Sequence, residues 1–438
     1  MKKLTGFLFA IVLATNLSAR ENEVVKTGWN FGALPTITFD TDLGFQYGAL
    51  VNLYNYGDGS RYPNYNHSLY FEVSRFTKGS GINRFYYDSD RLIEGLQTSV
   101  DLSYLSDQAY DFYGFNGYDA QVNAGWFDNE SPDYITRMFY KYDRKLFRFK
   151  VDLQGKLSGD HLRWIGGFNL LNFKIGSVDL EKLNKGKKGD DLLPDVPGLF
   201  EKYQEWAIIP EEELDGGFVP TFKGGIVFDS RDNRPNPMKG IWTEAVLEGA
   251  PEILGSENAF AKVSLVHRQY FTLVPKDLSL VYRLAYQTTV AGHAPFYYQS
   301  QVITSILTGA LSEGLGGAKT LRGIRRNRVV GDGFFYGNVE LRWKFARFQF
   351  INNNFYAGLN GFADFGTVTR KITVNPQNIT PGEKTAFFSN DAEKFHPSYG
   401  AGLRLAMNEN FVIAVDYGRA IREQDGNSGL YIGLNYLF

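Results

Sequence analysis

The chain has 438 residues, no cysteine and a formal net charge of −2 at pH 7. Disulfides, thiol chemistry and a cysteine-linked lipid anchor are therefore excluded, and the charge balance gives no reason to expect nucleic acid as a partner. Aromatic residues make up 16% of the chain and the mean hydropathy is −0.27, a combination typical of a transmembrane β-barrel, in which half of each strand faces water.

The N-terminus has the pattern of a secretory signal peptide over residues 1–19. A basic start is followed by a short apolar run and by a small-residue cleavage site before Arg20. A retained membrane anchor is the alternative, but Asn16 interrupts the run, which is too short to span a bilayer. Residues 20–32 are then expected to form a short periplasmic segment and residues 33–438 the barrel.

Beyond this signal no run of 18 apolar residues occurs, so a membrane would have to be crossed by strands. Apolar and polar residues alternate in many segments, as where Leu102 and Tyr104 flank Ser103. These segments predict an all-β fold, a 16-stranded antiparallel transmembrane β-barrel. The expected strands are 33–40, 43–56, 66–77, 80–89, 95–106, 134–157, 161–175, 218–229, 239–249, 257–273, 277–291, 334–347, 354–366, 397–407, 410–420 and 428–438.

The stretch 134–157 is interpreted as one strand rather than two because single-chain bacterial barrels have an even number of strands. With the N-terminus in the periplasm, the long connections then all lie on the extracellular side, as such barrels require. In one of these connections, Leu199, Phe200, Tyr203 and Trp206 recur at helical spacing and predict a short helix over the barrel mouth.

Residues 314–324, followed by a basic stretch and by 334–343, resemble the sixth extracellular loop and twelfth strand of the BamA and TamA superfamily of outer-membrane assembly barrels, the bacterial surface antigen type. The resemblance implies a loop folded into the lumen around the pair Arg322 and Gly323. It also implies that Arg322 reaches Glu340 and Asp364 on the next two strands. A buried guanidinium needs a carboxylate partner, and glycine allows a tight turn. The other basic residues of the loop, Arg325, Arg326 and Arg328, are expected to be solvated.

Two further stretches match the same superfamily. Asp229, Arg231, Asp232 and Asn233 resemble its periplasmic turn between the eighth and ninth strands, and residues 35–48 resemble its opening hairpin. The edges of the sheet that would close the barrel look weak. Pro35 removes a hydrogen-bond donor from the first strand, and Gly429 and Gly433 thin the last strand, which is expected to run to Phe438.

The resemblance implies a barrel in the outer membrane of a Gram-negative bacterium that assists insertion or translocation of proteins or lipids there. Most members carry periplasmic POTRA domains, whereas only residues 20–32 precede the first expected strand, so a member without them is expected. Its implied partners are outer-membrane lipid, lipopolysaccharide and other outer-membrane or periplasmic proteins.

Chemistry that would make the chain an enzyme is not evident in the sequence. The five histidines have no metal-ligand spacing, no nucleophile elbow or phosphate loop occurs, and neither a cofactor nor a metal is expected. Two alternatives to an assembly barrel stay open. The first is a passive or plugged pore with a structural role, and the second, less favoured, is an outer-membrane hydrolase whose residues assemble only in space.

Overall fold

The computed structural model describes residues 24–40, 44–234, 236–256, 258–305, 314–389 and 391–438. The predicted signal peptide, residues 1–19, lies outside the described residues, as does the start of the predicted segment 20–32. Among the helices that are described, none is long and apolar enough to cross a membrane.

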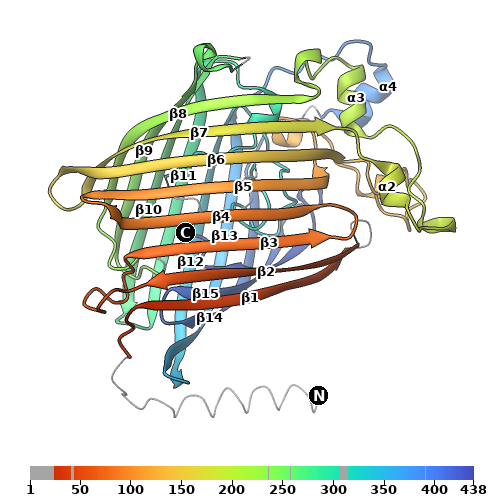
Figure 1. Ribbon diagram of the computed structural model, residues 1–438. Helices are drawn as coiled ribbons and strands as arrows, with labels where there is room; N and C mark the ends of the chain where they lie inside the picture. Colours follow the sequence, from red (N-terminus) through yellow and green to blue (C-terminus); the bar gives the residue numbers. More distant parts are fainter. Residues whose placement is uncertain (1–23, 41–43, 235, 257, 306–313, 390) are drawn as a thin grey trace, which may run out of the picture.

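The described residues form one antiparallel sheet of sixteen strands that pair in chain order, and the sheet curls around into a barrel (Figure 1). The strands are β1 Trp29–Asp40, β2 Gly44–Asn55, β3 His67–Phe76, β4 Gly81–Ile93, β5 Leu96–Asp111, β6 Lys141–Ser158, β7 Leu162–Gly176, β8 Gly216–Asp229, β9 Gly240–Ala250, β10 Phe260–Val274, β11 Leu278–Gly292, β12 Gly333–Phe350, β13 Asn353–Arg370, β14 His396–Met407, β15 Phe411–Ala420 and β16 Ser428–Leu434. The predicted fold class and strand number are confirmed.

Several strand boundaries differ from the prediction by four or more residues, and three of them bear on the strand count or on the edges of the sheet. The stretch 134–157 contributes one strand, as parity required, but this strand begins only at Lys141. The first strand begins at Trp29, inside the segment expected to be periplasmic, and β16 ends at Leu434 rather than at Phe438. The alternating pattern shows which side chains share a face, but not where backbone pairing stops.

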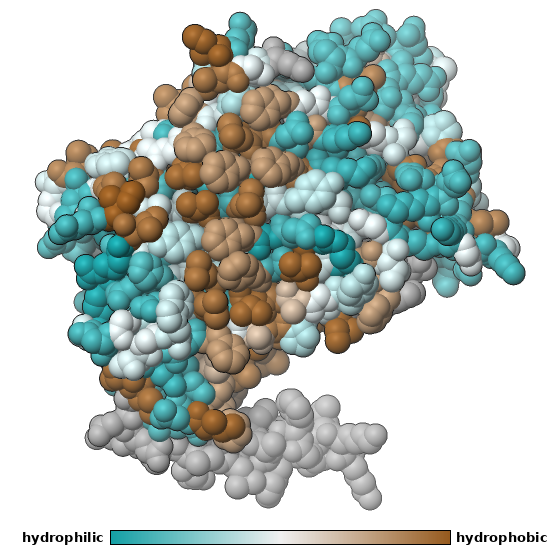
Figure 2. Space-filling model, in the orientation of Figure 1, coloured by the Kyte–Doolittle hydropathy of each residue, from teal (hydrophilic) through white to brown (hydrophobic). Residues whose placement is uncertain are grey.

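Alternation along each strand separates an apolar outside from a polar inside. In β12, the outward Val339, Leu341 and Trp343 are 39–49% exposed, whereas the inward Glu340 and Arg342 are buried. Figure 2 shows the outward residues as a hydrophobic belt between two hydrophilic regions. An outer-membrane barrel has this arrangement because lipid surrounds the belt and water or protein fills the lumen.

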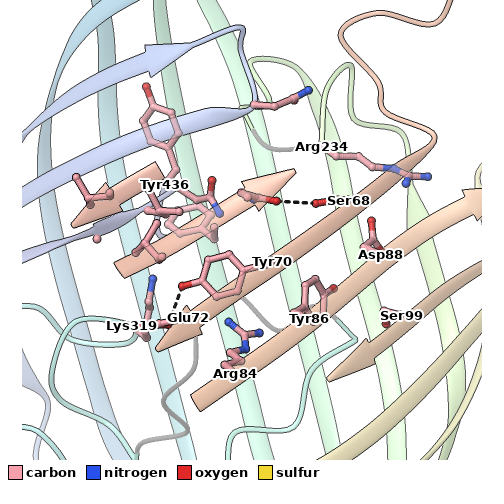
Figure 3. Close-up of a pocket in the computed structure, with 18 of the residues that line it drawn as sticks. Ser68, Tyr70, Glu72, Arg84, Tyr86, Asp88, Ser99, Arg234, Lys319 and Tyr436 are labelled. Carbon is pink, nitrogen blue, oxygen red and sulfur yellow. Dashed lines mark hydrogen bonds between the residues drawn. The ribbon is translucent and has the colours of Figure 1, made fainter. Parts of the chain in front are cut away.

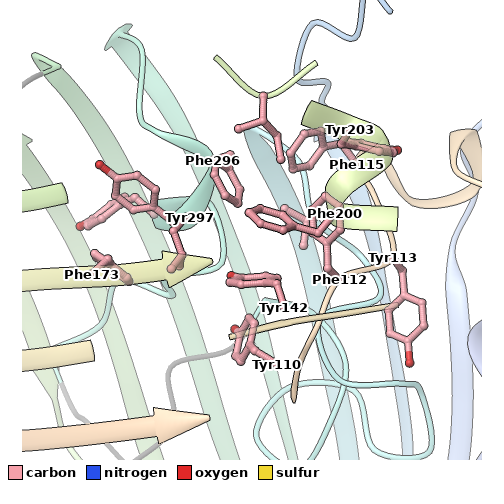
Figure 4. Packing of buried hydrophobic residues seen from close by; sticks show 14 of the residues in the cluster. Tyr110, Phe112, Tyr113, Phe115, Tyr142, Phe173, Phe200, Tyr203, Phe296 and Tyr297 are labelled. Carbon is pink, nitrogen blue, oxygen red and sulfur yellow. The ribbon is translucent and has the colours of Figure 1, made fainter. Parts of the chain in front are cut away.

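Long connections cover one end of the barrel. They carry the α-helices α2 Leu180–Asn184, α3 Leu199–Glu205 and α4 Pro381–Phe387. Short 3-10 turns occupy Gly117–Asp119, Ala124–Trp126, Gly189–Asp191, Glu211–Glu213, Glu252–Leu254, Phe296–Tyr298 and Glu423–Asp425. We call these connections the cap. Its aromatic core, in which Phe112, Phe200, Tyr203 and Phe296 pack together, is shown in Figure 4. The predicted helix over the mouth corresponds to α3, and the cap closes this end of the lumen.

Candidate functional site

Residues 314–332, which precede β12, place the side chain of Arg322 against the inner face of the sheet. Its guanidinium contacts Asp364 of β13 at two points, Nε to Oδ2 and Nη2 to Oδ1, both at 2.9 Å. Nη1 donates to Oε1 of Glu340 on β12 at 2.6 Å, and the guanidinium carbon lies 3.4 Å from the ring centre of Phe362. All three charged side chains are fully buried. The structure therefore brings Arg322, Glu340 and Asp364 together in a strong charge-assisted fork.

A third carboxylate, which the sequence analysis did not single out, completes this site. Oδ2 of Asp416 on β15 lies 3.5 Å from Nη1 of Arg322. Arg404 of β14 pairs with the same carboxylate at 2.7 and 2.8 Å, and Arg342 pairs with Glu340 at 2.7 Å. Three guanidinium groups thus balance three carboxylates, which is the condition for keeping so many charges out of water.

Gly323 turns the chain where no side chain fits. Its φ is +91°, and a Cβ atom there would lie 2.5 Å from the backbone nitrogen of Arg419 on β15. Its own amide donates to the hydroxyl of Tyr431 on β16 at 2.9 Å. The loop therefore touches the inner faces of β12, β13, β15 and β16, and glycine is required both for the backbone conformation and for the close approach.

The expectation that the neighbouring arginines are solvated is wrong for two of them. Arg326 pairs with Asp111 at 2.6 Å, at the end of β5. Arg328 is fully buried and donates to the carbonyl of Gly117 at 2.7 Å. The cap covers this part of the loop, and a covered cation must find protein acceptors in place of water.

The two edges of the sheet, β1 and β16, form a seam. Within the described residues, no backbone pairing joins these strands. Side chains bridge the periplasmic end instead. The ring of Phe411 on β15 lies where a Cβ of Gly32 on β1 would stand, and the hydroxyl of Tyr54 donates to the carbonyl of Asn410 at 2.9 Å.

Beyond β16 the chain turns into the lumen. Asn435 takes a left-handed φ of +68°, and its amide donates to the carbonyl of Val412 at 2.7 Å. Tyr436 and Phe438 are buried, and Arg342 donates to the carbonyl of Phe438 at 3.0 Å. Of the residues assigned to the seam by sequence, Pro35, Gly433 and Phe438 line one cavity, which Phe438 reaches from inside the lumen, against β10 and β11. Gly429 lies on β16 outside this lining.

The predicted periplasmic turn follows β8. Asp229 accepts from Nε of Arg231 at 2.9 Å, and the Arg231 guanidinium lies 4.5 Å from the ring centre of Trp242. Asp232 accepts from the amide of Met238 at 3.0 Å. Asn233 accepts from a nearby amide at 3.2 Å and so holds the turn together. Two of the four residues therefore shape the backbone, while Asp229 and Arg231 face the lumen.

A buried histidine cluster in the cap was missed by sequence reasoning. Nδ1 of His396 lies 2.6 Å from Oδ1 of Asp425, and Nε2 lies 3.2 Å from Oε1 of Glu393. The ring stacks on Tyr118 at 3.9 Å. Because both ring nitrogens face carboxylates, this histidine is unsuited to act as a general base. The cluster joins three connections that are remote in sequence, so no local motif could have indicated it.

The two carboxyl groups of this cluster are held ionised. Burial by itself would raise the pKa of Asp425 and Glu393. The hydrogen bonds and charge of His396 outweigh burial and lower the pKa of both carboxyls below the ordinary value. The cluster is therefore charged at neutral pH and ties the connections of the cap together.

A sixteen-stranded sheet curled into a barrel, with an apolar belt outside and charged side chains inside, defines an outer-membrane β-barrel of a Gram-negative bacterium. A family model described as the Omp85 superfamily domain matches residues 65–438. The chain belongs to the Omp85 superfamily, which confirms the resemblance drawn from the motifs.

Two solved structures are similar to this chain, and the second of them, CdiB, shares its fold. BamA from Haemophilus ducreyi lacking POTRA domains 1–3 is 14% identical, with 94% of this chain and 69% of that chain covered and a TM-score of 0.48. CdiB from Escherichia coli is 10% identical, with 92% of this chain and 61% of that chain covered and a TM-score of 0.52. The chain thus spans less than two thirds of CdiB. No curated protein matches the chain.

Proposed function

We propose that this barrel opens sideways between β1 and β16 and so assists the insertion or translocation of proteins or lipids at the outer membrane. The observation that carries the proposal is the unpaired seam. β1 has twelve residues and β16 has seven, so the two edges cannot match along their whole length. An unsatisfied backbone group costs several kcal/mol in lipid, which gives such an edge a strong tendency to accept another strand.

Two features support a seam that opens while the rest of the barrel stays intact. The left-handed Asn435 directs the chain inward just where β16 would otherwise continue along β1. The ion pairs of Arg322 itself reach only β12, β13 and β15, on the β16 side of the seam, although Arg326 of the same loop pairs with Asp111 at the end of β5. Opening would then leave the loop attached to a stable wall.

Disulfide locking tests the proposal cleanly because the chain has no native cysteine. Cysteine pairs would join residues 34–37 of β1 to residues 430–433 of β16, with formation followed by gel mobility. The matched control is Ala49→Cys with Val73→Cys, a directly opposed pair on β2 and β3. The readouts are folding of a urea-unfolded eight-stranded outer-membrane barrel into vesicles that hold the protein, and exchange of fluorescent lipid between their leaflets.

The expected result is loss of one or both activities in the seam-locked barrel under oxidation, recovery on reduction, and no loss in the control. Full activity of the locked seam would refute lateral opening.

A plugged barrel with a structural role is the second candidate, and the buried ion-pair network is the observation that favours it. Three guanidinium–carboxylate contacts inside the lumen keep residues 314–332 in place. Conductance across planar bilayers gives a direct test, since a lumen filled by this loop should carry only small currents. Inactivity of the unlocked wild type in both vesicle assays, together with small currents, would favour the structural barrel.

A further inference from the structure

A cavity of about 720 Å³ lies in the lumen. It extends from the seam, where Pro35 and Gly433 line it, to the turn after β8 and the inner faces of β2–β5. Figure 3 shows side chains entering this space from several elements, among them Arg84 on β4 and Arg234 in the turn. Its volume lies within the range of specific small-molecule sites, roughly 300–1,000 Å³.

The lining of this cavity is positively charged. Its cations outnumber its carboxylates by six to three. The six are Arg84, Arg163, Arg231, Arg234, Arg268 and Lys319, and the three are Glu72, Asp88 and Asp229. Arg84 is paired at 2.7 Å with Asp101, which lies outside this lining. The other five cations still outnumber the three carboxylates by two, whereas the charges of the Arg322 site balance.

In the part of the chain that the structure describes, three of these arginines have no polar partner for the guanidinium group, and one of them, Arg268, is buried with only the ring of Trp242 beside it, at 5.9 Å. Among the described residues, the guanidinium groups of Arg163, Arg234 and Arg268 make no hydrogen bond and no ion pair. Nε of Arg163 and Nε of Arg268 are shielded from solvent without an acceptor, and Arg268 is only 4% exposed. Arg163 lies within electrostatic reach of two like charges, Arg231 and Arg234, and of two opposite charges, Asp229 and Asp90, but it forms an ion pair with neither carboxylate. Such an arrangement is costly unless an anion occupies the space.

The other side of the cavity is apolar and reaches the outer surface. Ile37 of β1 and Leu430 and Ile432 of β16 line the cavity and are 64–69% exposed. A residue can line the cavity and also be exposed on the outer surface only where the cavity opens between β1 and β16. The outer surface at this opening belongs to the apolar belt. A single ligand that contacts both the cationic lining and this apolar opening must be anionic and amphiphilic.

We propose that this cavity binds the phosphate headgroup of an anionic lipid, with the acyl chains leaving between β1 and β16. Several guanidinium forks around one space suit a phosphate, which offers more acceptor oxygens than a carboxylate. The inference names lipid as the substrate class of the proposed function and rests on that function for the movement of lipid through the seam. Binding itself requires no opening beyond what the structure already has.

Equilibrium binding to the whole barrel in neutral detergent tests the proposal. The probes are phosphatidylglycerol, the zwitterionic phosphatidylcholine, dodecyl phosphate and inorganic phosphate, each competing with a fluorescent phosphatidylglycerol. The variants Arg163→Gln and Arg268→Gln each remove one unpaired cation. Arg91→Gln is the matched control, because its side chain is 56% exposed at the end of β4 and lies outside the cavity.

Phosphatidylglycerol and dodecyl phosphate should bind, phosphatidylcholine should bind at least about tenfold more weakly, and each cavity variant should lose about tenfold or more in affinity. The control should bind as the wild type does. Inorganic phosphate binding as tightly as dodecyl phosphate would overturn the lipid assignment, and equal affinity for both lipids would overturn the charge argument.

A β-strand peptide with a C-terminal carboxylate is added as a further competitor. If this peptide displaced the fluorescent phosphatidylglycerol and the unlabelled lipids did not, the site would be assigned to a polypeptide instead. The outcome is separable from the proposed function. If anionic lipid bound to the barrel as expected but the seam lock had no effect on activity, the binding site would be supported and lateral opening would be refuted.

Discussion

Replacement of Arg322 by alanine probes the site on which the position of residues 314–332 depends. The substitution removes one cationic partner from each of three carboxylates, but the three differ in the partners that they keep. Glu340 keeps Arg342 and Asp416 keeps Arg404, whereas Asp364 has no other cation within ion-pair distance among the described residues. The main cost is therefore one uncompensated buried carboxylate.

Removing one partner of a buried pair costs about 3–5 kcal/mol. If most of this cost falls on the folded-in position of the loop, the population of loop-open molecules rises by roughly 10²- to 10³-fold. Proteolysis follows that population when opening and closing are fast compared with cleavage. We therefore expect proteinase K to cut between residues 314 and 332 of Arg322→Ala about 10²-fold faster than in the wild type.

The assay uses folded barrel in detergent, with fragments identified by mass spectrometry. Arg325→Ala is the control, because that side chain donates to the backbone carbonyls of Glu423 and Gln424 and otherwise lies over the rings of Tyr113 and Phe127, without a carboxylate partner among the described residues. In a second variant, Arg322→Ala combined with Asp364→Asn, loss of the orphaned charge should recover part of the resistance. Wild-type cleavage and unchanged thermal stability of Arg322→Ala would refute the reasoning, and equal damage in the Arg325→Ala control would show that the effect is not specific to the network.

Three further perturbations have defined outcomes. Gly323→Ala should speed cleavage of the same loop about tenfold, because a left-handed φ costs alanine ~1–2 kcal/mol before any clash is counted, and resistance equal to wild type would contradict this. Asn435→Val should lower the thermal unfolding midpoint of the barrel and Asn435→Gly should not, because a β-branched residue resists a φ of +68° and glycine does not. Equal midpoints of the two variants would contradict the inward turn. The pKa of Asp425 is lowered despite burial, with the hydrogen bond and charge of His396 as the largest favourable cause, so its stabilisation is present above the unfolded value near 4 and is lost as pH falls through the lower folded value. The cap of the wild type should therefore become protease-sensitive as the pH falls below about 4, and a variant Asp425→Asn with the same pH profile would argue against this source.

Charge pairing inside the lumen was predictable only where a motif resemblance indicated it. The partners Glu340 and Asp364 of Arg322 came from the resemblance, since nothing in the local pattern around residue 322 points to positions 18 and 42 residues away. Asp416, 94 residues away, had no such motif and was missed. The burial of Arg328 was missed because it depends on the cap, which forms from connections distributed along the chain.

Strand alternation and connection length by themselves determined the number of strands, their antiparallel order and the end of the barrel that carries the long connections. These properties are local, because a two-residue period assigns each side chain to a face and parity assigns each connection to an end. Only the tertiary structure decided that β16 stops at Leu434, that His396 meets Asp425, and that unpaired arginines surround a cavity at the seam. Contacts across a lumen depend on how the sheet curls and on the paths of connecting segments, and no period in the sequence encodes either.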